Sequence, residues 1–138
     1  MRQESTELEV RTPGQGLHEV TDEVVRWVHG TEIATGLLTV FIRHTSASLL
    51  IQENAAPAAR RDLERYFAKV AQESGEYEHD DEGPDDMPAH LRSALTATSL
   101  SIPVVRGAPV LGTWQGVYLF EHRRMPHRRR LTLHLIGT

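Results

Sequence analysis

The sequence predicts a single α+β domain that combines a mainly antiparallel β-sheet with about three helices. Two observations favour this class. Short apolar runs of strand length cluster along the chain instead of alternating strictly with helical segments. The length of 138 residues also suits one domain, and there is no internal repeat. We expect the order β-α-β-β-α-α-β-β-β in one domain over residues 1–138.

The first half of the chain is expected to open with a strand and a helix. Residues Glu4–Arg11 alternate between polar and apolar side chains, which indicates a half-buried strand. Apolar residues recur at helical spacing over Gly16–His29, and Gly30 is a typical helix end. Two bounded apolar runs follow at Gly36–Arg43 and Ser48–Glu53. These runs could form a hairpin, or one long strand with a kink or bulge.

The second half is expected to hold two helices separated by a long loop. A start signal at Asn54–Pro57 opens a helix that runs through Gln72. Residues Glu73–Pro88 are acidic and rich in Gly and Pro, which predicts a loop of the kind that is usually functional or disordered. Pro88 suits the first turn of a third helix. Strands are expected at Leu100–Val105, Val110–Leu111, Gly116–Glu121 and Leu131–Ile136, with a turn at Gly107–Pro109.

The composition excludes several classes of protein. The chain has no cysteine, which removes disulfides, thiolate metal sites and cysteine nucleophiles. No apolar stretch approaches the roughly 20 residues that cross a bilayer, and the polar start of the chain lacks a signal-peptide core. We therefore expect a cytoplasmic protein with no membrane partner. A net charge of −4 gives no general attraction to nucleic acid.

Charge is distributed unevenly along the chain. Residues 73–86 are strongly acidic and residues 123–130 are strongly basic. The two segments either form separate patches or pair with one another. The basic segment looks like the tip of a hairpin, whose arginines could hold a phosphate by paired hydrogen bonds. A solvated turn, or a clamp on the acidic loop of a neighbour, is the other interpretation. Glu121 and His122 lie just inside the preceding strand and are better site candidates.

The strongest candidate site lies between His79 and His90, where two histidines flank five carboxylates. Neutral imidazole and carboxylate together are the ligands of zinc, manganese or iron. His44, at the end of a predicted strand, could complete a three-histidine site with an open position for a water or a substrate oxygen. Alternatively, the carboxylates alone could hold magnesium on a diphosphate. The plainer interpretation is a solvated acidic loop with incidental histidines.

Two further clusters are less specific. Ser46 and Ser48 follow His44, but no glycine-flanked elbow surrounds them, which argues against serine catalysis. Thr113, Trp114 and Gln115 lie between two glycines, which permit close approach of a ligand. A β-bulge with a core tryptophan explains the same pattern equally well.

Several segments, in this order, resemble the YjbQ-like family, also called the secondary thiamine-phosphate synthase family. They are His44-Thr45-Ser46-Ala47-Ser48, Gln52-Glu53-Asn54-Ala55, Asp62-Leu63-Glu64, Glu82-Gly83-Pro84-Asp85-Asp86-Met87-Pro88-Ala89-His90, Ser99-Leu100-Ser101-Ile102-Pro103-Val104, Gly107, Leu111-Gly112-Thr113-Trp114-Gln115-Gly116 and Glu121-His122-Arg123. The likeness spans nearly the whole chain and is more specific than any single motif. One departure is Ala56, where the family commonly carries aspartate.

The resemblance implies a homotrimer of α+β subunits with a site near the subunit contacts. It implies a weak thiamine-phosphate synthase activity on small phosphorylated metabolites. Together with the ligand types above, a zinc, manganese or magnesium ion is a possible cofactor, and no organic cofactor is expected. The expected catalytic residues are His44, Asp86, His90 and Glu121, and the expected metal ligands are His44, His79 and His90. Ligand contacts are expected from Asn54, Thr113, Gln115 and Arg123.

Two functions therefore remain open at the level of the sequence. One is an enzyme with a metal-assisted transferase or hydrolase site. The other is a trimeric protein that binds a metabolite or a metal without catalysis. The dedicated thiamine-phosphate synthase is a barrel enzyme of typically more than about 200 residues. A chain of 138 residues is too short for that fold, so any shared activity would be convergent.

Overall fold

The computed structural model describes all 138 residues and confirms a single α+β domain with three helices and mostly antiparallel sheets. The elements are β1 (Arg2–Thr12), β2 (Gly16–Glu19), α1 (Thr21–Gly30), β3 (Gly36–Ile42), β4 (Ala47–Glu53), α2 (Pro57–Val70), α3 (Asp86–Leu95), β5 (Ser99–Val105), β6 (Ala108–Pro109), β7 (Gln115–Glu121) and β8 (His127–Gly137). None of the three helices has the length and apolar composition needed to span a membrane.

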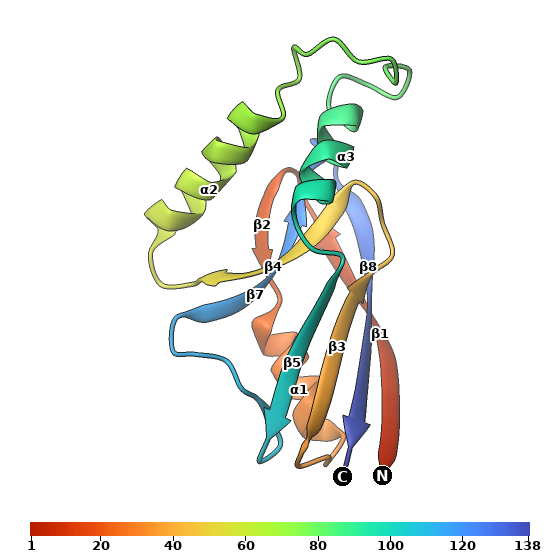
Figure 1. Ribbon diagram of the computed structural model, residues 1–138, viewed down its shortest axis with the longest axis vertical. Coiled ribbons are helices and arrows are strands. Elements are labelled where there is room, and N and C mark those ends of the chain that lie inside the picture. The colour runs from red at the N-terminus through yellow and green to blue at the C-terminus, as the bar shows by residue number, and fades with distance from the viewer.

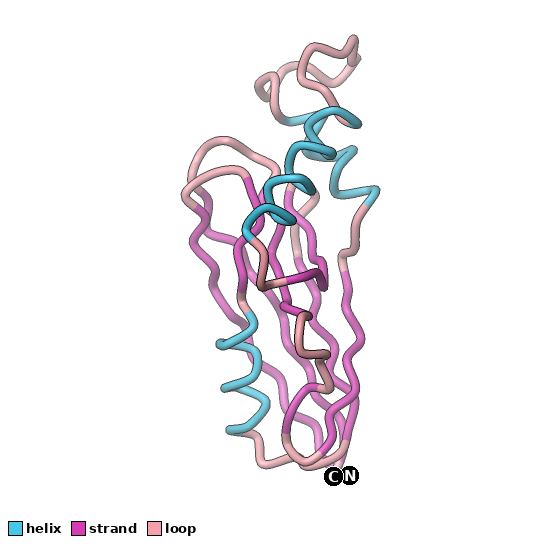
Figure 2. The backbone as a smooth tube through the Cα atoms, turned by 90° about the vertical axis from the view of Figure 1, so that its left-hand side faces the viewer, coloured by secondary structure: helices cyan, strands magenta, loops and turns pink.

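The strands form two antiparallel sheets (Figure 1). The larger sheet has the order β1-β8-β3-β5-β6 and the smaller sheet has the order β2-β7-β4. Helix α1 lies on one face of the larger sheet, and no helix covers the other face (Figure 1). Helices α2 and α3, with the loop between them, project beyond the strands at the end of the molecule opposite the two termini (Figure 2).

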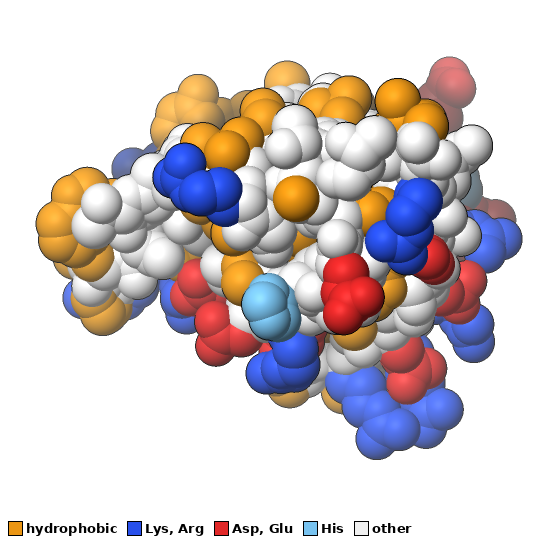
Figure 3. Space-filling model, turned by 90° about the horizontal axis from the view of Figure 1, so that it is seen from below, with side chains coloured by type: hydrophobic (Ala, Val, Ile, Leu, Met, Phe, Trp, Pro, Cys, Tyr) orange, Lys and Arg blue, Asp and Glu red, His pale blue; other side chains and the backbone are white.

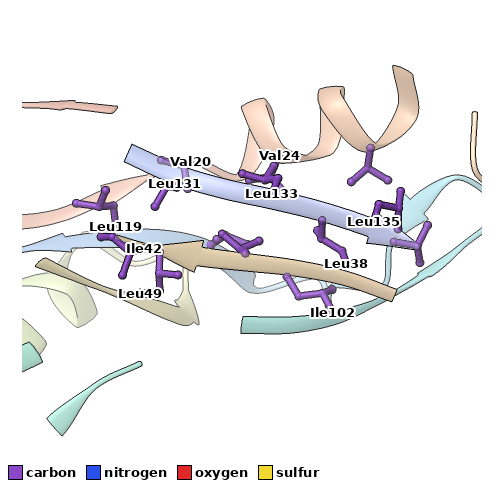
Figure 4. Close-up of a cluster of buried hydrophobic side chains, with 14 of the residues drawn as sticks. Val20, Val24, Leu38, Ile42, Leu49, Ile102, Leu119, Leu131, Leu133 and Leu135 are labelled. Atoms are coloured by element: carbon purple, nitrogen blue, oxygen red, sulfur yellow. The ribbon is translucent and has the colours of Figure 1, made fainter. Parts of the chain in front are cut away.

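The main core fills the space between α1 and the two sheets. Strand β8 alternates strictly, so Leu131, Leu133 and Leu135 all point inward and are fully buried. Val24 (labelled in Figure 4) and Val28, one helical turn apart on α1, belong to the same cluster. Residues from both sheets complete this core, so the two sheets and α1 share one hydrophobic cluster.

The smaller sheet is covered on both faces. Leu119 of β7 points into the main core, whereas Tyr118 and Phe120 point the other way, toward Leu63 and Phe67 of α2. Because both faces are covered, β7 is buried continuously from Gly116 to Glu121. The end of β7 is therefore a rigid, dry position for a charged side chain.

Two sequence predictions about elements were wrong, and a third was right only in part. The predicted helix Gly16–His29 is interrupted, because Gly16–Glu19 pairs with β7 as an edge strand and the helix begins only at Thr21. The predicted turn at Gly107–Pro109 is confirmed at Gly107, whose φ is 77°, but Ala108–Pro109 form the short strand β6, which pairs with the end of β5. The predicted strand Val110–Leu111 lies outside the strands, and Val110 N donates to Pro103 O.

The structure contains neither the hairpin considered for residues 36–53, where one long kinked strand was the alternative, nor the hairpin expected around the basic segment. Strands β3 and β4 do not pair with one another, because the chain passes from the larger sheet to the smaller one between them. Between β7 and β8, the chain passes back from the smaller sheet to the larger one. Both crossings occur at the same end of the molecule, which brings His44–Ser46 beside the residues that follow β7. The two sheet changes thus create the place where polar residues converge.

Replacing Gly36 with alanine should destabilise the fold. A Cβ at this position would lie 2.3 Å from Ile136 O, a backbone atom held in the pairing of β3 with β8. Overpacking of this kind costs about 1–3 kcal/mol of the free energy of unfolding, which urea denaturation measures. Gly30→Ala is the matched control, because nothing lies within 4 Å of its Cβ position. Equal stability of the two variants would contradict the close packing of these strands.

Candidate metal centre

Four side chains with metal-binding atoms converge at the start of α3. His79 and Glu82 come from the acidic loop, and Asp86 and His90 lie one turn apart on α3. One ligand atom of each residue lies within 4.8 Å of every other. Residues four apart on a helix share a face, which is why Asp86 and His90 point to the same place. The acidic loop folds back and brings His79 and Glu82 to the same place.

Asp86 is the centre of this group. Its Oδ2 lies 2.8 Å from His79 Nε2 and 3.1 Å from His90 Nε2. His79 Nε2 also lies 3.0 Å from a carboxylate oxygen of Glu82. Two imidazole nitrogens and two carboxylates therefore face one point.

The orientation of the His90 ring indicates which nitrogen can bind a metal. His90 Nδ1 lies 2.9 Å from the backbone oxygen of Thr45. A carbonyl oxygen only accepts hydrogen bonds, so Nδ1 carries the proton and Nε2 of the neutral ring has a free lone pair. That lone pair faces Asp86 Oδ2, another acceptor, and the two repel unless a proton or a cation lies between them. A backbone carbonyl on the distal nitrogen is also the usual support of a metal-bound histidine.

Arg123 fixes the other side of the group. Its Nη1 donates to Asp86 Oδ1 at 2.6 Å and its Nε to Asp85 Oδ2 at 3.1 Å, while Nη2 donates to Glu82 O at 2.9 Å. One guanidinium thus ties the helix start to the acidic loop. It leaves Asp86 Oδ2 free to face the imidazoles, as a well-supported ligand requires.

The charges around Asp86 shift its pKa and that of His79. Burial opposes ionisation of Asp86, but the hydrogen bond with His79 and the charge of Arg123 contribute to lowering its pKa. The hydrogen bond with Asp86 raises the pKa of His79. In the absence of a metal, a proton on His79 therefore stabilises the group. A divalent cation would replace that proton, so metal affinity should fall as the pH is lowered.

The residues present fit a divalent transition-metal ion. They offer two imidazoles and two carboxylates, a donor set that suits zinc, manganese or iron better than magnesium. The His79 side chain is 43% exposed, so the group is open to small molecules from solvent.

The comparisons with known proteins decide the family. A family model described as "UPF0047 protein YjbQ-like" matches residues 6–138. The chain belongs to the YjbQ-like family. It is 51% identical over 137 residues to the UPF0047 protein sll1880 of Synechocystis, a match that covers 99% of this chain and 93% of that protein. It is 43% identical to the UPF0047 protein YjbQ of Escherichia coli O157:H7, with 94% and 95% of the two chains covered.

Solved structures of the YjbQ-like family show the same fold. A member from Clostridium acetobutylicum superposes with a TM-score of 0.87 at 30% identity, covering 95% of this chain and 99% of that one. A protein from Sulfolobus solfataricus has a TM-score of 0.89 at 21% identity, covering 99% and 100% of the two chains. The second likeness concerns the fold alone.

In this YjbQ-like chain, His44 lies outside the group of four ligands. Its Nε2 accepts a hydrogen bond from the backbone N–H of Arg130 at 3.0 Å, so that lone pair is occupied. Burial and the charge of Arg129 lower the pKa of His44, which keeps the ring neutral. The next residue, Thr45, is the one that orients His90. His44 thus lies next to the group and not within it.

Glu121 and His122 are buried beneath the site. Glu121 accepts hydrogen bonds from Thr12 Oγ1 at 2.6 Å and from Arg129 Nε at 2.7 Å. Burial opposes ionisation of Glu121, but these hydrogen bonds outweigh burial and lower its pKa. Its Oε2 also accepts from the backbone N–H of Arg123 at 3.1 Å. Glu121 is fully buried, so in this chain it acts by holding Arg129 and the residue that orients Asp86.

Ser48 and His122 form a hydrogen-bonded pair that resembles a nucleophile with its base. Ser48 Oγ lies 2.9 Å from His122 Nε2, but both residues are fully buried. No substrate reaches them, and the pair serves the packing between β4 and the end of β7. This geometry agrees with the sequence argument against serine catalysis.

The predicted ligand contacts fall into two separate places. Arg123 lies in the group, whereas Asn54, Thr113 and Gln115 lie at the opposite end of the smaller sheet. Gln115 pairs with Glu53 and Glu121 pairs with Ala47, so seven strand residues, about 20 Å, separate the two ends. Ala56 lies at the same distant end, before α2.

Trp114, in the same segment, is 62% exposed, so it is not a core tryptophan.

Two contributors to the site were not singled out from the sequence. Glu82 was visible only as one of five carboxylates, and nothing in its spacing distinguishes it from Asp80 or Asp81. The backbone oxygen of Thr45 has no side-chain signal at all.

Arg123→Gln should weaken zinc binding about 10- to 100-fold, because removal of a supporting residue has effects of this size. Titration of metal-depleted protein with a zinc indicator measures the affinity. Arg26→Gln, which removes an exposed arginine without an ion pair, is the control. A change of less than about twofold in Arg123→Gln would show that the guanidinium does not orient the ligands.

Proposed function

We propose that this protein binds a divalent transition-metal ion through His79, Glu82, Asp86 and His90 and uses it in an enzymatic reaction on a phosphorylated metabolite. The observation that carries the proposal is the convergence of these four ligand atoms within 4.8 Å. The hydrogen bond from His90 Nδ1 to Thr45 supports it, because it turns the free lone pair of the ring toward the carboxylates.

The specific reaction that we propose rests on the family resemblance. The ring nitrogen of a thiazole phosphate attacks the methylene carbon of hydroxymethylpyrimidine diphosphate. The bond from that carbon to the diphosphate oxygen breaks, and diphosphate leaves with the electron pair. A bound metal ion would supply a Lewis acid that stabilises the negative charge on the leaving group. His79 and Glu82 are exposed, so a substrate can approach the group of ligands from their side.

A cationic cavity near the start of β8 supports the binding of phosphate groups. Its volume is about 470 Å³, and Arg11, His127 and Arg128 line it. Arg123 is already bonded to the acidic loop, whereas Arg128 makes no ion pair and has all its donors available. Guanidinium groups bind phosphate oxygens by paired hydrogen bonds. We assign Arg128 the phosphate-binding role and Arg123 a positioning role.

The test is a turnover assay with both substrates, following thiamine phosphate and released diphosphate. Metal-depleted protein should be inactive and should regain activity with zinc or manganese, and His90→Ala should lose at least about 100-fold in kcat/KM. His29→Ala, which changes an exposed histidine on α1, is the control. Metal binding without turnover would favour the non-catalytic alternative, and full turnover by metal-depleted protein would exclude a metal-assisted reaction.

We further propose that the uncovered face of the larger sheet is a contact between copies of this chain in a homotrimer. Leu37 and Phe41 of β3 point outward there and are each 44% exposed. Pro103 and Val105 of β5 extend this apolar surface. Hydrophobic side chains also gather along one border of the molecule when it is viewed from below (Figure 3). An open sheet face with large apolar side chains is typical of an interaction surface.

Phe41→Lys should dissociate the trimer. Sedimentation analysis should give three chains of 15.5 kDa for the wild type and one for the variant. Tyr66→Lys, which changes an exposed aromatic on α2, should remain trimeric. A monomeric wild type, or a trimeric Phe41→Lys variant, would contradict this contact.

A further inference from the structure

A second cavity lies between α2 and the smaller sheet. Its volume is about 350 Å³, and its wall includes residues of α2, the start of β2, the end of β7 and Arg92 of α3. None of the four candidate metal ligands lines it. Cavities of this size accommodate small molecules.

Arg92 is the unusual group in the wall of this cavity. It is only 8% exposed, yet it forms no ion pair, and its Nε has no hydrogen-bond partner. The guanidinium makes one hydrogen bond, from Nη2 to Ala71 O at 2.8 Å. A guanidinium has five N–H donors, and a buried charge without partners is strongly unfavourable. Arg92 therefore has donors available for a ligand.

The carboxylates in the same wall are mostly occupied. Both oxygens of Glu121 are bonded within the protein, and Glu64 Oε2 accepts from Leu17 N at 2.9 Å. Glu73 is different, because one oxygen is ion-paired while the other, Oε1, is buried without a partner. Among its buried atoms, the wall thus contains a donor, Arg92 Nε, and an acceptor, Glu73 Oε1, that lack partners.

The charge and shape of the wall limit the kind of ligand. The three carboxylates of Glu64, Glu73 and Glu121 are balanced by Arg92 and by the arginines that pair with Glu73 and Glu121. A cavity of balanced charge favours a neutral ligand over an ion. Phe67 and Phe120 pack edge to face, with ring centroids 5.3 Å apart, and form the apolar part of the wall, against which an aromatic ring can pack.

We propose that this cavity binds a small, neutral, planar molecule that presents a hydrogen-bond acceptor to Arg92 and a donor to Glu73. A primary amide or an amino-substituted nitrogen heterocycle has this chemistry. The site is separate from the metal ligands, so its occupation does not depend on the metal.

Three probes of the same shape test the charge and hydrogen-bond requirement. Benzamide is neutral with a donor and an acceptor, benzoate is an anion with acceptors only, and benzamidine is a cation with donors only. In titrations followed by backbone amide NMR shifts, benzamide should perturb the residues around the cavity with a Kd of about 1 mM, as expected for a fragment of nine heavy atoms. Benzoate and benzamidine should bind at least fivefold more weakly.

Variants then place the probe in the cavity. Arg92→Gln should weaken benzamide binding at least fivefold. Ala68→Phe, a change on the exposed rim of α2 that should fill the cavity without affecting the core, should abolish it. His90→Ala should leave it unchanged, which separates this site from the metal centre. Tighter binding of benzoate than benzamide, no binding of any probe, or benzamide binding that survives Ala68→Phe would overturn the proposal.

Discussion

Asp86→Asn should lower the zinc affinity of the protein more than about 100-fold. The Oδ2 atom of Asp86 is the common partner of both imidazoles, and Arg123 holds the carboxylate in place from the other side. Asparagine keeps the shape of the side chain but removes its charge. Loss of a supporting residue alone costs about 10- to 100-fold in metal affinity, so loss of the central ligand should cost more.

Calorimetric titration of metal-depleted protein measures this effect. Asp80→Asn is the matched control, since it removes the same charge from an exposed position in the same loop. The control separates direct ligation from the general field of the acidic segment. Similar losses in both variants would mean that the loop attracts cations without a defined site.

The second large effect is a loss of stability in acid caused by His122. Burial, with a further contribution from the charge of Arg92, lowers the pKa of His122 from 6.5 to about 3. Between these two pH values the unfolded chain binds a proton at this position and the folded chain does not. Folding stability is therefore complete above about pH 6.5 and is lost as the pH falls, at 1.36 kcal/mol per unit for a single group.

Urea denaturation at pH 6.5 and pH 4.5 measures this loss. The wild type should lose roughly 2–3 kcal/mol more than His122→Gln over this interval. His29→Gln, at an exposed position, should behave like the wild type. The raised pKa of His79 acts in the opposite direction, because its protonated form stabilises the folded state, but it is common to all three proteins. Parallel losses in wild type and His122→Gln would contradict a neutral, buried imidazole.

The strands could be predicted from the sequence where packing follows a local pattern. Alternation over residues 131–136 reflects one buried face of β8, and the apolar run in β3 reflects a central strand. Strand β2 could not be predicted, because Leu17 also continues the helical spacing of α1. Its pairing with β7 is a tertiary interaction that overrides the local pattern.

The sheet changes after β3 and β7 could not be predicted for a similar reason. Two apolar runs joined by a short polar segment look like a hairpin in the sequence, whether or not the strands pair. In this fold, the two runs of each pair belong to different sheets: β3 and β8 lie in the larger sheet, and β4 and β7 lie in the smaller one. Residues from both sheets fill the core between them.

The candidate site was partly predictable because most of its ligands lie in one segment. His79 and His90 were singled out by the density of histidines and carboxylates in the acidic loop, and Asp86 by the family resemblance; the structure brings the three together. His44 carried no such local signal, and its neighbours Arg129 and Arg130 come from the far end of the chain. The sequence left open whether the acidic and basic segments pair with one another. They do, because Arg123 and Arg124 form ion pairs with residues of the acidic segment.

Elemental analysis of freshly purified, tag-free protein tests the central claim most directly. Wild type, His90→Ala and His29→Ala should be compared after incubation with zinc and manganese and removal of free metal. The metal centre predicts a stoichiometric ion in the wild type and in His29→Ala, and none in His90→Ala. Absence of bound metal from the wild type, or equal metal content in all three proteins, would contradict it.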